Sequence, residues 1–243
     1  MMRLDVYLTE ARLVDSRTDA KNFILSGAVN VNGKVIKKPS FEVDGEEKIS
    51  VDKSGKKYVS RGGLKLEAAL EAFSVDVTGV VAIDIGASSG GFTDCLLQRG
   101  ANRVIAVDSG SGQLVDSIRN DGRVAVYENF NARYMSQKDF EYIPDVAVMD
   151  VSFISAKLIM PAVSNLLYAG GKYICLIKPQ FEVGRGGLNK KGIVKNSDLR
   201  EKAVNEVVEF AGICGFVLHG LIESPIVGGD GNIEYLAYFE KRN

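Results

Sequence analysis

The sequence predicts a doubly wound α/β fold with a mainly parallel sheet, preceded by a small α+β domain. From residue 80 onward, short apolar runs alternate with segments of helical spacing, which is typical of a parallel sheet covered by helices. The stretch 80–94, VVAIDIGASSGGFTD, contains a strand apolar on both faces, a glycine-rich turn and the start of a helix. The first fifty residues instead contain two short helical segments and a hairpin signal at Asn32-Gly33.

The composition is that of an ordinary soluble protein, with 46% hydrophobic and 25% charged residues among 243. The net charge of −1 hides an asymmetry, because residues 1–63 carry 12 Lys and Arg against 9 Asp and Glu. A basic front end indicates an anionic partner. No run approaches the roughly 18 apolar residues of a membrane span, and the N-terminus lacks the apolar core of a secretion signal. We therefore expect a cytoplasmic protein without membrane contact.

The cysteines and the histidine predict no chemistry of their own. Cys95, Cys175 and Cys214 lie far apart in apolar sequence, without metal-ligand spacing or an obvious disulfide pattern. We expect buried free thiols in a reducing compartment, and no metal site. His219, the only histidine, lies in an apolar stretch and is expected to be structural.

The first segment predicts helix, helix and hairpin. Apolar spacing from Leu4 to Leu13 favours one helix. Ser16 is expected to cap a second helix, with Asp19 as a weak capping box and Gly27 as its C-cap. The hairpin VNVNGKVIK follows, and residues 48–51 form a further strand.

This pattern, carried by SRTDAKNFILSGAVNVNGKVIKKPS, resembles the S4 RNA-binding domain. The resemblance implies that the second helix and the turn after it face RNA, with Arg and Lys meeting phosphates. The alternative is a solvated helix face with a few basic residues. The candidate contacts carried over by position are Arg3, Ser16, Arg17, Lys21, Asn22 and Lys34.

A polar, glycine-rich stretch, KSGKKYVSRGG, predicts a boundary between domains. We expect a first domain over residues 1–55, a linker over 56–63 and a second domain over 64–243. The second domain opens with a helix over 64–73 that has Lys65 in its first turn. Because a cation at a helix start is mildly unfavourable, this lysine is better explained if it faces a site.

The rest of the second domain predicts the sheet. Four more apolar runs follow the strand over 80–85, and helices are expected over 155–167 and 196–212. The strands are expected over 103–108, 123–127, 145–150 and 172–178, with two closing strands over 216–222 and 234–239.

The glycine turn decides between cofactors. A dinucleotide fingerprint needs G-x-G-x-x-G, and G-A-S-S-G-G fails that spacing. The turn instead resembles the S-adenosylmethionine loop of class I methyltransferases, which implies this cofactor and that type of sheet. Asp108 ends the next strand, where nucleotide-binding folds place a carboxylate for ribose hydroxyls. The implied cofactor residues are Asp84, Gly86, Ser88, Gly90, Phe92 and Thr93 toward the methionine, Asp108 on the ribose, and Asn129 and Asn131 near the adenine.

Four charged residues are expected to meet at one edge of the sheet. Asp150 and Lys178 end strands that we expect to be neighbours, and ligands of parallel sheets bind beyond those ends. Glu234 begins the last strand, which reaches the same edge if it is antiparallel, and Lys65 enters from the preceding helix. This Lys–Asp–Lys–Glu set resembles the FtsJ-like ribose 2′-O-methyltransferases.

Together with the front domain, the chain resembles the TlyA family, often labelled haemolysins but acting as rRNA methyltransferases. SRGGLKL, DIGASSGGFTD, MDVSFIS, IKPQFE and GNIEY carry this resemblance. It implies methyl transfer from S-adenosylmethionine to a ribose 2′-hydroxyl, of a cytidine, in rRNA or a ribosomal subunit. The short chain favours the large subunit. The oligomeric state is left open.

The chemistry requires alignment and removal of the hydroxyl proton. A lysine acts as a base only if its pKa is lowered, by burial or by another nearby ammonium. We expect Lys178 to be the base, Lys65 to tune it or orient the hydroxyl, and Asp150 and Glu234 to position the lysines.

Two other functions stay open at this point: a non-catalytic RNA-binding factor that keeps the cofactor fold, and a membrane-lytic protein. The basic, glycine-rich segment 181–195 is either a mobile loop that closes over RNA or a solvated connection. Residues 227–231, VGGDG, form a second flexible turn beside the expected site.

Overall fold

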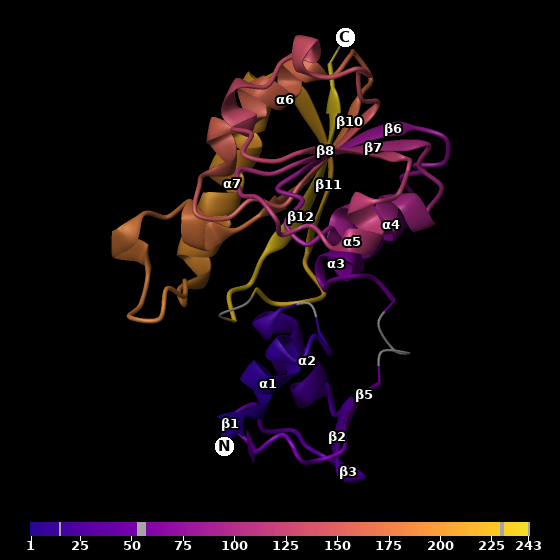
Figure 1. Ribbon diagram of the computed structural model, residues 1–243. Helices are drawn as coiled ribbons and strands as arrows, with labels where there is room; N and C mark the ends of the chain where they lie inside the picture. The colour runs from indigo at the N-terminus through magenta and orange to yellow at the C-terminus, as the bar shows by residue number, and fades with distance from the viewer. Residues whose placement is uncertain (15, 53–56, 229–230, 243) are drawn as a thin grey trace. The chain divides into compact units, whose positions relative to one another are not determined.

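The computed structural model describes every residue except 15, 53–56, 229–230 and 243. The chain divides into two compact units, Met1–Lys57 and Tyr58–Asn243 (Figure 1). Each unit has a hydrophobic core of its own.

The first unit is the small α+β domain that the sequence predicts. The Ser16 hydroxyl accepts a hydrogen bond from the Asp19 amide, and Gly27 ends the second helix in the left-handed region, which confirms both expected caps. Asn32 and Gly33 both have positive φ, as a tight hairpin turn between right-twisted strands requires. The elements are β1 (Met2–Arg3), α1 (Leu4–Glu10), α2 (Arg17–Ser26), β2 (Val29–Val31), β3 (Lys34–Val35), β4 (Glu42–Val43) and β5 (Ile49–Val51), with β3, β2 and β5 side by side and β1 paired to β4.

The second unit is built on one sheet with the order β11-β12-β10-β9-β6-β7-β8. Strands β6 to β10 pair in parallel, and β12 is antiparallel to β10, which confirms the expected class I arrangement. The strands are β6 (Val81–Ile85), β7 (Arg103–Val107), β8 (Val124–Tyr127), β9 (Val146–Met149), β10 (Lys172–Ile177), β11 (Phe216–Glu223) and β12 (Tyr235–Lys241).

Helices cover both faces of this sheet (Figure 1). One face packs against α3, α4 and α5, and the other against α6 and α7. Successive residues of a strand point to opposite faces, so a strand covered on both sides must be apolar throughout, as β9 is. The helices are α3 (Gly62–Ala72), α4 (Gly91–Gln98), α5 (Asp116–Arg119), α6 (Met160–Leu166) and α7 (Ser197–Ile213), with 3-10 turns η1 (Ala132–Tyr134), η2 (Gln137–Asp139), η3 (Ala156–Leu158), η4 (Pro179–Phe181) and η5 (Arg185–Gly187).

The expected linker over 56–63 differs from what the structure shows for residues 58–63, and residue 56 lies outside the described residues. Tyr58 is buried and its hydroxyl donates a hydrogen bond to Glu67. The Val59 amide donates to Asp94 Oδ2 at 2.7 Å, and α3 begins at Gly62, two residues earlier than expected. Residues 58–63 therefore pack on α3 and α4 as part of the second unit.

The remaining differences are local. The helix expected over 155–167 is a 3-10 turn followed by α6, with a proline in the first turn of α6.

Cys95 and Cys175 are buried free thiols whose pKa burial raises to about 12, and Cys214 is free and half-buried. His219 lies on the edge strand β11, 5.4 Å from the Tyr238 ring between centroids. Among the described helices, none combines the length and the apolar character needed to cross a bilayer.

Candidate active site

The four charged residues form two lysine–carboxylate pairs at the carboxyl edge of the sheet. Lys65 Nζ lies 2.5 Å from Glu234 Oε2, and Lys178 Nζ lies 2.5 Å from Asp150 Oδ1. The strand register explains the convergence. Ile177 pairs with Tyr235, so the next step along places Lys178 opposite Glu234, and β9 lies on the other side of β10 and ends just before Asp150.

The two pairs differ in their environment. Lys65 and Glu234 are buried, with 9% and 3% of their surface exposed, so each charge needs the other as a partner. In the second pair the Asp150 side chain is 21% exposed, whereas the Lys178 side chain is 11% exposed, as is that of Lys65. Lys178 also donates a hydrogen bond to Ser152 Oγ at 2.8 Å, while Asp150 Oδ1 accepts no well-directed hydrogen bond from the described residues. The Lys178 ammonium is thus held between a carboxylate and a hydroxyl.

The glycine turn after β6 approaches Asp150 closely. Gly86 has φ +86°, and a Cβ at this position would lie 2.5 Å from the Asp150 carbonyl oxygen. The Gly86 and Ala87 amides both donate to the Val107 carbonyl, which fixes the turn against β7. Only glycine combines this φ with this approach.

A cavity of about 360 Å³ opens beside this turn, between the ends of β6, β7 and β9. Its volume is within the range of small-molecule sites, roughly 300–1,000 Å³, and it lies where ligands of doubly wound sheets bind. Its walls combine apolar side chains with a few polar groups. They include Ile85, Gly86, Ser88, Val107, Asp108, Phe130, Asn131, Asp150, Ser152, Phe153 and Ile159.

The expected cofactor residues divide into two groups. Gly86, Ser88, Asp108 and Asn131 line the cavity. Asp108 also holds the wall together, because its carboxylate accepts hydrogen bonds from the Ser88 and Gly110 amides at 2.8 and 2.7 Å. The others lie outside the cavity lining: they are Asp84, Gly90, Phe92, Thr93 and Asn129.

Asp84 is a fully buried carboxyl group behind the turn. The Thr93 hydroxyl donates to its Oδ2 at 2.6 Å, whereas its Oδ1 has no hydrogen-bond partner among the described residues. Burial, with the negative charge of Asp150 adding to it, raises the pKa of Asp84 to about 7. A buried carboxylate with an unused oxygen is suited to a cationic ligand group.

The raised pKa of Asp84 predicts that the free energy of unfolding depends on pH. Its pKa is raised from about 4 in the unfolded chain, so its stabilising contribution is complete below about pH 4 and is lost as pH rises to about 7. The free energy of unfolding of the wild type should fall, relative to Asp84→Asn, by on the order of 1 kcal/mol per pH unit between about pH 5 and 7. Denaturant titrations of both proteins measure this difference, and a difference that is flat over this range would contradict the assignment.

The structure places at this site several residues that were not predicted from the sequence. Glu182 accepts hydrogen bonds from Ser155 Oγ at 2.6 Å and from the Ala156 amide at 2.7 Å, and so ties the loop after β9 to the turn after β10. Phe153, in that loop, has φ +64° and 92% of its surface exposed, and its ring lies 5.2 Å from that of Phe181. An exposed, strained aromatic residue at a cavity mouth is suited to stack on a nucleobase. The apolar pair Phe153-Ile154 directly after a strand end was the available signal.

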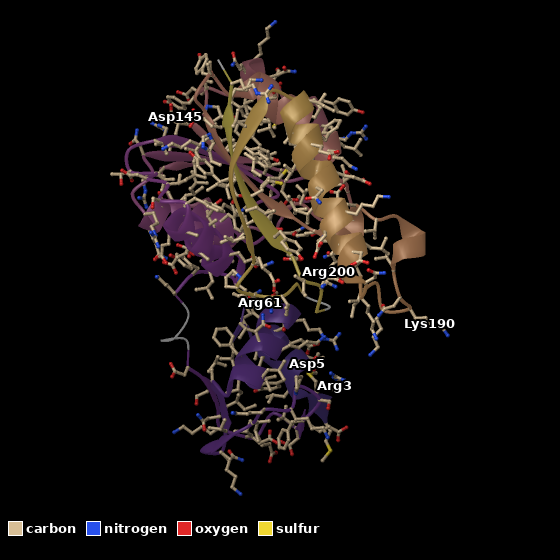
Figure 2. The ribbon with its side chains drawn as sticks, turned by 180° about the vertical axis from the view of Figure 1, so that it is seen from behind. Arg3, Asp5, Arg61, Asp145, Lys190 and Arg200 are labelled. Atoms are coloured by element: carbon tan, nitrogen blue, oxygen red, sulfur yellow. The ribbon has the colours of Figure 1, made fainter. Side chains whose placement is uncertain are left out.

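In the first unit, one buried carboxylate holds two of the expected RNA contacts. Arg3, which lies beside Asp5 in Figure 2, donates to both oxygens of that carboxylate, at 2.9 and 3.1 Å. Arg17 Nε donates to Asp5 Oδ2 at 3.3 Å. The guanidinium of Arg3, and then that of Arg17, keeps the pKa of Asp5 below its ordinary value despite its burial. About half of each arginine side chain stays exposed, 47% and 57%. Lys21 and Lys34 are exposed, Asn22 is half-buried, and Ser16 is exposed but engaged as the helix cap.

Comparison with known proteins gives the family. The S4 domain matches residues 2–49 and the FtsJ-like methyltransferase matches residues 58–241. Hemolysin A of Brachyspira hyodysenteriae is 44% identical over 98% of this chain and 99% of its own length. The 16S/23S rRNA (cytidine-2′-O)-methyltransferase TlyA of Mycobacterium tuberculosis is 40% identical over 97% of this chain and 88% of its own. A solved structure from Streptococcus thermophilus has a TM-score of 0.81 and 45% identity, covering 99% of this chain and 88% of that one. The chain therefore belongs to the FtsJ-like methyltransferase family and, within it, to the TlyA group, with an S4 domain ahead of its methyltransferase domain.

Proposed function

We propose that this protein transfers a methyl group from S-adenosylmethionine to the ribose 2′-hydroxyl of a cytidine in ribosomal RNA. One observation carries the proposal: two lysine–carboxylate pairs meet at the edge of the sheet, beside the cavity formed by the glycine turn. The nucleotide and the RNA are taken from the relative named TlyA, which is similar to this chain over nearly all of its length.

The residues present fit this cofactor. Asp84 lies behind the cavity lining and has a buried carboxylate oxygen that no described group uses, which suits the ammonium of the methionine part. The absence of a side chain at Gly86 lets the turn approach the Asp150 carbonyl beside the cavity. Asp108 and Asn131 line the opposite part of the cavity, where a ribose and a base would be held. When bound, S-adenosylmethionine supplies a methyl group that is already activated by its sulfonium charge.

The protein's own contribution is alignment and proton removal. In its neutral amine form, Lys178 Nζ takes the proton of the 2′-hydroxyl and becomes an ammonium, and Asp150 and Ser152 hold that nitrogen in one position. The Lys65–Glu234 pair orients the hydroxyl from the other side of β10. A ribose hydroxyl is a weak nucleophile, so placing it in line with the methyl group accounts for a large share of the rate.

Methyl transfer to isolated ribosomal subunits tests the proposal. Purified protein and labelled S-adenosylmethionine are incubated with each subunit separately, and we expect label in rRNA. Asp150→Ala should abolish the labelling while leaving RNA binding intact. Binding of RNA without binding of S-adenosylmethionine, measured by calorimetry, would favour a non-catalytic RNA-binding factor. Labelling of neither subunit would refute the proposed enzyme.

We expect the first unit to contribute a measurable part of the affinity for RNA. Replacing Arg3 and Arg17 together by alanine should weaken binding to rRNA about 10–100-fold at low salt and reduce the salt dependence by about two phosphate contacts. Fluorescence anisotropy over a salt series measures both. Arg123→Ala is the control, because that arginine is paired with Asp121 at the amino end of β8. If the double variant and the control bind alike, Arg3 and Arg17 are not RNA contacts.

A further inference from the structure

The Asn232 side chain joins two segments that are far apart in the sequence. It is 3% exposed, its Oδ1 accepts a hydrogen bond from the Val194 amide at 3.0 Å, and its Nδ2 donates one to the Gly192 carbonyl at 3.0 Å. A side-chain amide that uses its donor and its acceptor on one short stretch of backbone acts like a strand partner. Asparagine supplies both groups, whereas aspartate lacks the donor and alanine lacks both.

The segment that Asn232 holds is a basic turn, which we define as residues 189–195. Asn189 closes it, since its Oδ1 accepts from the Lys191 and Ile193 amides at 2.8 and 3.0 Å. Arg200, at the start of α7, donates to the Val194 and Lys195 carbonyls at 3.2 and 3.0 Å. Figure 2 shows Lys190 projecting outward, away from Arg200. The exposed lysines of the basic turn are Lys190, Lys191 and Lys195.

On its other side, Asn232 belongs to the segment that carries Glu234. The Asn232 carbonyl accepts from the Gly228 amide at 2.8 Å, and the Glu234 carbonyl accepts from the Ser224 amide at 2.8 Å. A Cβ at Gly228 would lie 2.5 Å from Glu234 Oε1, so Gly228 rests directly against that carboxylate. The position of Glu234 is thus tied, through Asn232, to that of the basic turn.

We infer that Asn232 is a positioning residue that couples phosphate contacts on the basic turn to the placement of the Glu234 carboxylate against Lys65. The inference rests on the proposed function, because RNA is the anion that the basic turn would meet. Exposed lysines supply sequence-independent affinity for a phosphate backbone. Because Asn232 is hydrogen-bonded to the basic turn, RNA that binds to the basic turn also stabilises the segment that contains Asn232 and Glu234. Loss of Asn232 keeps the lysines in the chain, but the basic turn is no longer held in position, so their phosphate contacts and their connection to the site are both lost.

Steady-state kinetics on the full-length protein separate this coupling from a merely structural role. Asn232→Ala should raise the KM for RNA about as much as the Lys190→Ala/Lys191→Ala double variant does and lower kcat about 10-fold, with the affinity for S-adenosylmethionine within about two-fold of wild type. Asn232→Asp, which keeps the acceptor, should be intermediate and serves if the alanine variant fails to fold. Asn205→Ala, at an exposed position of α7, is the matched control and should behave as wild type.

A combined variant gives the decisive comparison. Since contacting residues that act as one unit are not additive, adding the two lysine substitutions to Asn232→Ala should raise the KM no further than the lysine substitutions alone. Fully multiplicative effects, or an unchanged kcat in Asn232→Ala, would overturn the inference while leaving the proposed function intact. Absence of methyl transfer by the wild type would overturn the proposed function, and this inference with it.

Discussion

Lys178→Ala should lower kcat for methyl transfer about 1,000-fold, the loss expected when a positioned base is removed. The Lys178 ammonium lies 2.5 Å from Asp150 Oδ1 and 2.8 Å from Ser152 Oγ, two residues that line the cavity. No other lysine is placed there by the described residues except Lys65, whose ammonium is buried against Glu234. Single-turnover labelling of rRNA measures the rate of the chemical step without product release.

The control for this variant lies on the same strand. Lys172 begins β10 at the opposite edge of the sheet, so Lys172→Ala should keep the wild-type rate. Binding of rRNA and of S-adenosylmethionine should be close to normal in both variants. A Lys178→Ala protein that binds both ligands and transfers methyl at nearly the wild-type rate would show that the base is another group.

Gly86→Ala should weaken the binding of S-adenosylmethionine about 100-fold. The added Cβ would meet the Asp150 carbonyl oxygen at 2.5 Å, and relief requires moving either the turn or Asp150, both of which line the cavity. The positive φ and the overlap together cost about 3 kcal/mol, which corresponds to about two orders of magnitude in affinity. Calorimetric titration measures this directly.

Gly79→Ala separates the cost of the positive φ from the cost of the overlap with Asp150. Gly79 also has a positive φ, +74°, but a Cβ there would have nothing within 4 Å. This variant shares the conformational cost without the overlap, so it should be less stable to unfolding but bind the cofactor normally. Equal loss of binding in both variants would mean that backbone strain, rather than the approach to Asp150, explains the result.

The sequence predicts most of this fold because the strands are unusually uniform. Strands β6, β7, β9 and β10 are apolar on both faces, which only a doubly covered sheet accommodates, and the expected bounds differ from the observed ones by a residue or two. The caps at Ser16 and Gly27 are equally local signals. The segment 58–63 was predicted as linker because its composition is polar. Its anchoring depends on Tyr58 and Val59 meeting Glu67 and Asp94, and composition does not encode such tertiary contacts.

The convergence of the four charged residues at the carboxyl ends of the strands was predictable, but their individual contacts were not. Strand ends identify Asp150 and Lys178, because parallel strands deliver their carboxyl ends to one edge. Which lysine pairs with which carboxylate follows from the register between β10 and β12 and from the position of α3, neither of which can be obtained from one sequence. The side-chain bonds of Asp108 to the glycine turn and of Asn232 to the basic turn join segments 20 to 40 residues apart, and no periodic pattern marks such bonds.

Chemical mapping of the methyl group on the RNA product tests the central claim most directly. After reaction with ribosomal subunits, the rRNA is digested to nucleosides and analysed by mass spectrometry, with partial alkaline hydrolysis to locate the modified position. We predict a methyl group on the ribose oxygen of a cytidine, which protects the adjacent phosphodiester from alkali, and its absence when Lys178→Ala or Asp150→Ala replaces the wild type. A methyl group on a base, or a ribose methyl group formed equally well by these variants, would contradict the account.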